Sequence, residues 1–432
     1  MVFARVVLLP ILLLGLAPLL TAQMVEPSVY TRRLRAPEPP SRIDWAARVT
    51  ALLKEEPGDT IVTAVGDMIF NEPISHLADP ERRQLFRILQ EADLAYGNLE
   101  CSINDRPELQ RPFYNFRASR EMGWDLARIG INLVSLANNH ALDFGPEGLT
   151  ECLRNLDRMN IDYAGAGNSL AEAHAPAIKS VQGVKTRFGL LSYMRYWSAK
   201  YRTKDASGPS LATIDPAVIL VDRDGKVEPV EGVLEKDVKT MEDDILLARR
   251  KADVLLVSLH NHDVSHDRVN GIQDKTPPND ALMFRRAIDA GADLVLGSGP
   301  HVLRGIELYK GKPIFYSLSD FIYQYRTPGR IPTDLPHQRD LEMPRPTNVS
   351  VWDRRDSPEV MEGVLIRMTV NGGQLKRIQL IPIAIDDEGP LFGVPRLVSD
   401  AQAKVILGRL QRLSAPYGTT FLDRGWYAEL AL

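Results

Sequence analysis

The sequence has few cysteines, no basic excess and a single long apolar run, and each shortage narrows the class of protein. Cys101 and Cys152 are too few for the disulfide framework that stabilises small secreted domains. They leave open one disulfide bond or two buried thiols. The formal net charge of -4 at pH 7 gives no electrostatic reason to expect nucleic acid, which normally binds a basic surface.

The motifs of several common enzyme classes are also absent. The sequence has no Gly-x-Ser-x-Gly nucleophile elbow, so a serine hydrolase of that kind has no nucleophile. It has no His-Glu-x-x-His zinc helix and no Gly-x-x-x-x-Gly-Lys-Ser/Thr phosphate loop. Gly165-Ala166-Gly167 lacks the third glycine of a dinucleotide-binding fingerprint.

The apolar run lies at the N-terminus. Arg5 precedes an uncharged stretch over 6–20, and small residues follow it, which predicts a cleaved signal peptide over 1–22. A retained membrane anchor or a buried helix is the alternative, although the run is short for a bilayer. Residues 23–59, polar and rich in proline at first, are expected to be a linker and N-terminal extension. We therefore expect an exported protein, periplasmic or extracellular, or anchored by its N-terminal segment.

From residue 60 onward, short β-branched runs alternate with amphipathic stretches, which predicts a layered α/β domain. The expected strands are 60–66, 93–97, 131–137, 186–193, 253–260 and 293–297. The expected helices are 75–91, 120–130, 146–160, 235–251 and 279–290. Further strands without intervening helices indicate a mixed sheet or a second sheet packed on the first, and they are 312–317, 362–370 and 375–383.

These elements place the main domain at 60–390 and a helical extension at 391–432. Two stretches, 196–231 and 324–359, show no regular pattern and are expected to be irregular, the second as a lid or binding loop. The second stretch carries six arginines that could meet an anionic substrate or simply face solvent: Arg326, Arg330, Arg339, Arg345, Arg354 and Arg355.

One pattern recurs five times: an apolar strand ends and potential metal ligands follow. These residues are Asp67; Asn98 and Glu100; Asn138, Asn139, His140 and Asp143; His260, His262 and His266; and Ser298 and His301, with His76 as a further candidate. Ligands bind beyond the carboxyl ends of strands in α/β sheets, where such side chains meet. A mixed carboxylate and imidazole set suits one or two divalent ions of the Mn, Fe, Zn or Co type.

Each residue alone also has a structural interpretation. Asn138 and Asn139 could serve turn geometry, and Asp143 could cap the helix that follows. The glycines at 66, 97 and 297 are expected to permit sharp strand exits that aim the side chains inward. The repeated pattern favours a metal site.

At these positions the chain resembles the CapA family of poly-γ-glutamate capsule synthesis proteins, which have the calcineurin-like metallophosphoesterase fold. The resemblance covers about 60–323. The matching segments are Val65-Gly66-Asp67, Gly97-Asn98-Leu99-Glu100, Leu136-Ala137-Asn138-Asn139-His140, Asp143-Phe144-Gly145, Ser258-Leu259-His260, Gly299-Pro300-His301-Val302-Leu303 and Phe315-Tyr316-Ser317-Leu318.

The resemblance implies a four-layer α-β-β-α sandwich with a one- or two-metal centre. The ligands it implies are Asp67, Glu100, Asn139, His260 and His301, with Glu100 as the bridging candidate and Asn98 as its rival. His140 would then be an acid or base near the substrate, oriented by Asp143. Arg117 is a candidate clamp for an anion, since guanidinium binds carboxylate or phosphate through two hydrogen bonds; a surface ion pair is the alternative.

The chain departs from the family pattern at three places. The family commonly has His where this chain has Ser298, Trp-Gly where it has Asn261-His262, and Gly-Asn where it has Ser319-Asp320. We expect His262 or Asp320 to replace the lost ligand in part.

Three functions follow as alternatives. The favoured one is an exported metal-dependent protein of capsule or poly-γ-glutamate biosynthesis that hydrolyses or transfers a γ-glutamyl or related bond with a metal-activated water. The second is an extracytoplasmic metallophosphoesterase, and the third is a non-catalytic subunit that binds or exports an anionic polymer. The expected partners are an anionic polymer, peptide or phosphoester substrate and membrane proteins of capsule synthesis and export. Nucleic acid is not expected.

Overall fold

The computed structural model describes residues 43–106, 115–181, 183, 185–195, 208–223, 226–261, 274–324 and 358–432. The expected signal peptide, His262, His266 and the six arginines of 324–359 lie outside the described residues. Residues 43–432 form one compact unit. Among the helices that are described, none has both the length and the apolar character needed to cross a membrane.

The larger sheet has ten strands in the order β22-β23-β20-β19-β1-β2-β5-β6, with β18 beside β1 and β21 beside β20. Their bounds are β1 Asp59–Ile69, β2 Leu94–Leu99, β5 Leu133–Ser135, β6 Asp162–Ala164, β18 Asp320–Tyr323, β19 Glu362–Asn371, β20 Gln374–Ile385, β21 Pro395–Leu397, β22 Phe421–Asp423 and β23 Ala428–Leu430. Strands β1, β2, β5 and β6 are parallel, whereas β19 and β20 are antiparallel. The sheet is therefore mixed, as the strands without intervening helices predicted.

The smaller sheet has seven strands in the order β11-β9-β14-β15-β17-β16, and β8 pairs with β9. Their bounds are β8 Ala177–Ser180, β9 Arg187–Arg195, β11 Thr213–Ile214, β14 Val254–Asn261, β15 Leu294–Ser298, β16 Ile306–Tyr309 and β17 Lys312–Phe315. Strands β9, β14, β15 and β17 are parallel, so their carboxyl ends lie at one edge. Two short pairs lie outside both sheets: β3 Ser102–Ile103 with β4 Arg117–Ala118, and β7 Ala166–Gly167 with β10 Ser210–Leu211.

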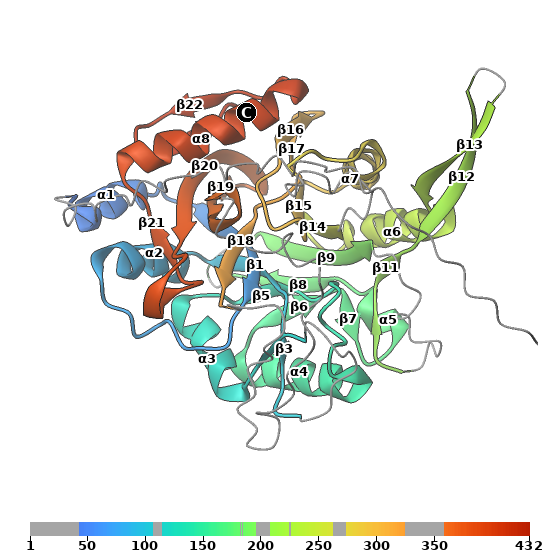
Figure 1. Cartoon of the computed structure of the whole chain (residues 1–432), viewed down its shortest axis with the longest axis horizontal. Helices are drawn as coiled ribbons and strands as arrows, with labels where there is room; N and C mark the ends of the chain where they lie inside the picture. Colours follow the sequence, from blue (N-terminus) through green and yellow to red (C-terminus); the bar gives the residue numbers. More distant parts are fainter. Residues whose placement is uncertain are drawn as a thin grey trace, which may run out of the picture. The chain divides into compact units, whose positions relative to one another are not determined.

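Three apolar clusters define the layers (Figure 1). Helices α1 Trp45–Leu52, α2 Pro80–Gln90, α3 Arg120–Ile129 and α4 Gly145–Met159 pack with one face of the larger sheet. The other face meets the smaller sheet, where Val62 and Leu94 join a cluster with Leu190 and Leu256. Helices α6 Glu235–Ala248 and α7 Pro278–Ala290 cover the far face of the smaller sheet. The four-layer α-β-β-α arrangement is confirmed.

The helices begin and end where local chemistry requires. Asp79 and Ser119 cap α2 and α3 by accepting backbone N–H groups of Arg82 and Met122. Gly130 ends α3 with φ 108, a left-handed conformation that glycine adopts without steric cost. Helix α3 thus begins where the sequence predicted, whereas α2 begins at Pro80 and not at 75, because Asp79 caps it there.

Three segments carry structure beyond what the sequence predicts. Within 196–231, expected to be irregular, strands β12 Pro216–Arg223 and β13 Lys226–Val233 form a hairpin. Within 23–59, expected to be linker and extension, α1 buries Trp45 and Val49. The segment 391–432 contains α8 Asp400–Ser414, but β21 and β23 also pair with β20, so this segment extends the larger sheet. Strands of three residues are too short to show an alternating pattern.

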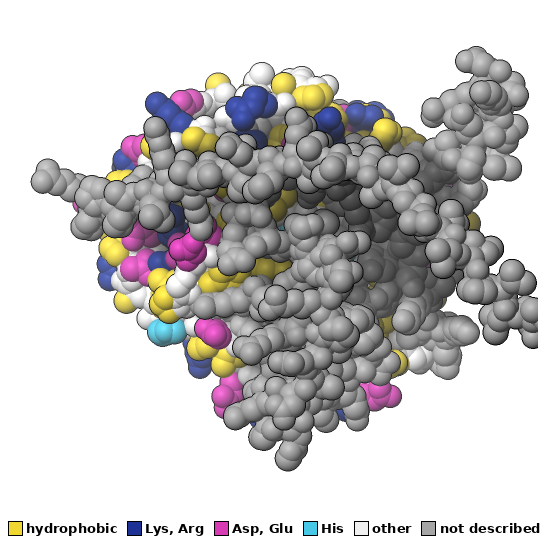
Figure 2. Space-filling view, viewed as in Figure 1, with side chains coloured by type: hydrophobic (Ala, Val, Ile, Leu, Met, Phe, Trp, Pro, Cys, Tyr) yellow, Lys and Arg dark blue, Asp and Glu magenta, His cyan; other side chains and the backbone are white. Residues whose placement is uncertain are grey.

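The described surface carries charges of both signs. On the face shown in Figure 2, Lys and Arg side chains are interspersed with Asp and Glu side chains. A typical pair is Arg187 with Asp253 at 3.3 Å, in which the side chains are 48% and 43% exposed. Such exposed pairs contribute at most about 1 kcal/mol each. The stability of the fold therefore comes mainly from the apolar layers.

Candidate metal centre

Asp67 lies inside β1, not beyond its end as the sequence predicted. The registers of β1 with β2 and with β18 both shift next to Asp67, which marks a bulge that re-aims the side chain. The glycine before it has a different role from the one expected. Gly66 has no positive φ; instead, a Cβ there would lie 1.8 Å from the carbonyl oxygen of Ser319. Gly66 therefore permits the close approach of two strands.

Gly297 and Gly97 also permit close packing, and not the sharp strand exit that the sequence analysis expected. A Cβ at Gly297 would lie 2.2 Å from the carbonyl oxygen of Tyr316, and one at Gly97 would lie 2.6 Å from the side chain of Met68. Neither residue has positive φ. All three glycines thus serve packing against a neighbouring chain segment and do not make the turn that the sequence suggested.

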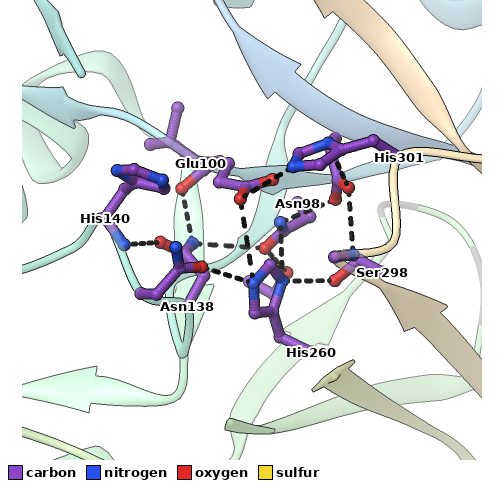
Figure 3. A network of polar contacts seen from close by, with 12 residues as sticks. Asn98, Glu100, Asn138, His140, His260, Ser298 and His301 are labelled. Carbon is purple, nitrogen blue, oxygen red and sulfur yellow. Dashed lines mark hydrogen bonds and ion pairs between the residues drawn. The ribbon is translucent and has the colours of Figure 1, made fainter. Parts of the chain in front are cut away.

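The predicted ligands come together in two overlapping groups. Asp67, Glu100 and His260 place one ligand atom each within 4.8 Å of one another, and so do Asp67, His301 and Asp320. All five side chains are buried; the most exposed, His301, is 8% accessible. Oε1 of Glu100 lies 3.8 Å from Nε2 of His260 and 3.7 Å from Nε2 of His301 (Figure 3). Glu100 thus lies between the two imidazoles.

This donor set fits a divalent cation. Burial of three carboxylates is costly unless positive charge lies beside them. The pKa of the Asp67 carboxyl is raised to about 6, mainly by burial and in part by Asp320, against the opposite effect of His301. Burial also lowers the pKa of His260 well below 6.5, so this imidazole is neutral, the form that binds metal. Carboxylate oxygens and imidazole nitrogens suit ions of the Mn, Fe, Zn or Co type.

Asn98 is a hydrogen-bond centre under the ligands (Figure 3). Its Oδ1 accepts from the Ser135 hydroxyl at 2.8 Å and from Nδ2 of Asn138 at 3.3 Å. Its Nδ2 donates to Oδ1 of Asp67 at 2.8 Å. Asn98 thus accepts two hydrogen bonds through its oxygen and holds Asp67 through its nitrogen, and whether Glu100 or Asn98 bridges two ions stays a prediction.

Polar side chains hold both imidazoles, at both ring nitrogens of His260 and at Nδ1 of His301. His260 has Oδ1 of Asn139 2.7 Å from Nε2 and the Ser298 hydroxyl 2.9 Å from Nδ1. His301 has Oδ1 of Asp320 2.7 Å from Nδ1. His301 also has φ 57, a strained backbone that concentrates at functional sites. Asn139 thus contacts a member of a candidate ligand group, and its role as a ligand stays a prediction.

His140 and Asp143 form a buried pair next to these groups. Nδ1 of His140 lies 2.7 Å from Oδ2 of Asp143, which also accepts the backbone N–H of Phe116 at 2.8 Å. The ring of Phe116 stacks on the imidazole with centroids 4.0 Å apart. Phe116 fixes the plane of the His140 ring, a role that its position between Asn115 and Arg117 in the sequence did not reveal.

Two other candidates lie apart from the ligand groups. Nη1 of Arg117 donates to the carbonyl of Arg106 at 2.8 Å, and its guanidinium lies 5.6 Å from the ring centroid of Phe144. Arg117 therefore packs beside the helix that follows the His140 turn. His76 is exposed in the loop before α2 and belongs to neither ligand group. His262 lies outside the described residues.

Residues 61–325 match the family model of the bacterial capsule synthesis protein PGA_cap. The chain belongs to this family. Two uncharacterised proteins of Sinorhizobium fredii, y4sH and y4uA, are each 31% identical to it over 430 residues, covering 85% of this chain and 92% of their own. The capsule biosynthesis protein CapA of Bacillus anthracis is 25% identical over 292 residues, covering 65% of this chain and 64% of its own.

The PGA_cap match includes every predicted ligand, from Asp67 to His301, and ends just beyond β18. The resemblance to the CapA family that the motifs carried is therefore confirmed. The match excludes β19 to β23 and α8, although these elements complete the larger sheet. Sequence reasoning missed Phe116 and the hydrogen-bonded Tyr96, whose hydroxyl lies 2.8 Å from Ser258 and 2.9 Å from Ser135.

Proposed function

We propose that the chain is an exported, metal-dependent protein of capsule or poly-γ-glutamate biosynthesis that hydrolyses or transfers a γ-glutamyl or related bond. The observation that supports this most is the buried Asp67, Glu100 and His260 group beside the His140–Asp143 pair. One set of residues suits a divalent cation and the other suits proton transfer. Family membership and the printed roles of CapA proteins support the capsule context.

The residues divide the chemistry between them. A divalent cation held by Asp67, Glu100, Asn139, His260 and His301 would lower the pKa of a bound water and polarise the bond to be cleaved. The carboxylate of Asp143 accepts the N–H at Nδ1 of His140, which leaves Nε2 as the atom that exchanges a proton. A protonated His140 can then donate from Nε2 to the leaving nitrogen.

The geometry around His140 supports this role. The stacked Phe116 ring and the Asp143 carboxylate hold the imidazole from its face and from its edge. The His140 side chain is 7% accessible, so it is largely shielded from bulk water. Arg117 directly follows Phe116, and we assign its guanidinium to the binding of a substrate carboxylate.

The test compares two histidine–aspartate pairs in the same protein. His174 lies 2.7 Å from Asp244, the same Nδ1–Oδ2 distance as in the His140–Asp143 pair, but belongs to neither ligand group. Metal-loaded wild type, His140→Ala and His174→Ala are assayed on a defined γ-glutamyl oligomer and on a simple phosphoester. We expect His140→Ala to lower turnover of the oligomer by about 10²- to 10⁴-fold with its metal retained. His174→Ala should keep wild-type turnover.

The outcomes separate the three functions. Turnover of the phosphoester alone would replace the proposal by a metallophosphoesterase. Bound metal without turnover of either substrate would leave a subunit that binds or exports an anionic polymer. Equal turnover in wild type and His140→Ala would remove His140 from the chemistry.

A further inference from the structure

Ser298 stands directly before Gly299, at the edge of the candidate metal centre. It is the last residue of β15 and is 2% accessible. Its hydroxyl lies 2.9 Å from Nδ1 of His260, on the ring nitrogen that does not face Glu100 (Figure 3). Ser298 therefore contacts the imidazole of a candidate ligand on the side away from Glu100.

The chemistry of a neutral imidazole limits which nitrogen can bind a cation. His260 is buried, and an imidazole that binds a cation is neutral, so it would carry one N–H, on either Nδ1 or Nε2. Nε2 faces two oxygen atoms, Oδ1 of Asn139 at 2.7 Å and Oε1 of Glu100 at 3.8 Å. For Nε2 to present its lone pair to a cation among these oxygens, the proton must be on Nδ1. Nδ1–H then needs an acceptor.

Asn98 and Ser298 both lie near Nδ1 of His260, and they differ in whether they can accept. Nδ2 of Asn98 lies 3.4 Å away, but it is an amide nitrogen and a donor. Its identity as nitrogen follows from its partner, because it donates to the carboxylate of Asp67 at 2.8 Å. The hydroxyl oxygen of Ser298 lies 2.9 Å from Nδ1 and can accept its N–H.

His301 repeats this arrangement on the other side of Glu100. Oδ1 of Asp320 lies 2.7 Å from Nδ1 of His301, a normal hydrogen-bond distance, while Nε2 lies 3.7 Å from Oε1 of Glu100. Both imidazoles thus point Nε2 toward the same oxygen of Glu100 and have an oxygen acceptor at Nδ1.

We propose that Ser298 and Asp320 are positioning residues, which accept the Nδ1–H of His260 and of His301 and thereby hold each Nε2 toward a cation at Glu100. This proposal rests on the cation of the proposed function and adds the tautomer of each ligand and the group that sets it. Ser298 is then not a lost ligand, and Asp320 orients His301 without binding the cation itself.

The experiment is a Co²⁺ titration of the full chain, followed by the absorption spectrum of the bound ion. The variants are Ser298→Ala, Ser298→Thr and Asp320→Asn, with Ser192→Ala as the matched control. Ser192 is a buried serine paired with Ser258 on the neighbouring strand, and its hydroxyl has no hydrogen-bond partner among the described residues.

We expect Ser298→Ala to bind Co²⁺ about 10- to 100-fold more weakly, with unchanged stoichiometry and an altered spectrum. Ser298→Thr keeps the hydroxyl and should restore the wild-type affinity and spectrum. Asp320→Asn keeps an acceptor oxygen and should keep the wild-type stoichiometry. Ser192→Ala should match wild type. That result would show that loss of any buried hydroxyl in this sheet does not by itself weaken Co²⁺ binding.

Two results would overturn the proposal while the proposed function stands. One is Ser298→Ala that binds Co²⁺ with wild-type affinity and spectrum. The other is loss of a bound ion in Asp320→Asn, which would make Asp320 a ligand. Wild type that binds no Co²⁺ would instead overturn the proposed function and this inference together.

Discussion

The carboxylate of Asp67 accepts the backbone N–H of Gly299 across 3.0 Å. Asp67 belongs to β1 of the larger sheet, and Gly299 directly follows β15 of the smaller sheet, so this bond joins the sheets at the candidate metal centre. Gly299 has φ 106, and a Cβ there would lie 2.9 Å from the carbonyl oxygen of Asn261. The geometry of the site therefore depends on how closely the two sheets pack.

The first prediction concerns Gly66. In Gly66→Ala, the new methyl group would overlap the carbonyl oxygen of Ser319, so β1 and β18 must separate next to Asp67. We expect the free energy of unfolding, measured by urea denaturation, to fall by about 2–4 kcal/mol.

The control is Gly408→Ala. Gly408 lies in α8, and the nearest atom to its added Cβ is 3.7 Å away on a flexible arginine side chain. That substitution should stabilise the protein by about 0.5–1 kcal/mol, because alanine is the better helix former. Equal small effects of the two substitutions would contradict the packing role of Gly66.

The second prediction concerns the pH dependence of the metal-free protein. Burial lowers the pKa of His260 well below 6.5, so the unfolded chain gains a proton at this residue before the folded chain does. The contribution of neutral His260 to folding stability is therefore present above the pKa of histidine in the unfolded chain and is lost as the pH falls below it. Between pH 7 and pH 5 we expect His260 to remove about 2 kcal/mol from the free energy of unfolding. Denaturation in chelator measures it, and His260→Gln should lack this part of the slope.

The third prediction concerns Arg117. A lysine keeps the positive charge but cannot form two parallel hydrogen bonds with a carboxylate. We expect Arg117→Lys to raise the KM for a γ-glutamyl substrate about tenfold, with kcat within about twofold of wild type. Arg187→Lys is the control. Arg187 is the first residue of β9, at the end of that strand away from His260, so this substitution should change neither constant. A fall in kcat alone would place Arg117 in the chemical step instead of in binding.

Much of the fold could be predicted because its central elements are long and periodic. The strand expected at 60–66 is β1, and the one at 253–260 is β14; both are apolar runs buried on two faces. The hairpin of β12 and β13 was missed because turn-rich composition around it favoured a loop. The strands of the C-terminal segment were missed because their three-residue length carries no pattern.

The residues of the site could be predicted, but not their arrangement. The carboxylate and imidazole residues at the ends of the expected apolar strands were enough to select Asp67, Glu100 and His260. Which nitrogen of an imidazole faces a ligand depends on partners such as Ser298, which is 38 residues from His260 in the chain. Such tertiary hydrogen bonds leave no local signal in the sequence, so Ser298 could only be expected as a missing ligand.

The most direct test of the central claim is Mn²⁺ binding to the full chain, measured by calorimetric titration of chelator-treated protein. The variants are Asp67→Ala and Glu100→Gln, with Asp244→Asn as a control in a histidine-paired aspartate outside the ligand groups. We predict at least one bound ion per chain in wild type and in Asp244→Asn, and its loss in both site variants. Wild type that binds no divalent ion, or site variants that bind as tightly as wild type, would contradict the account.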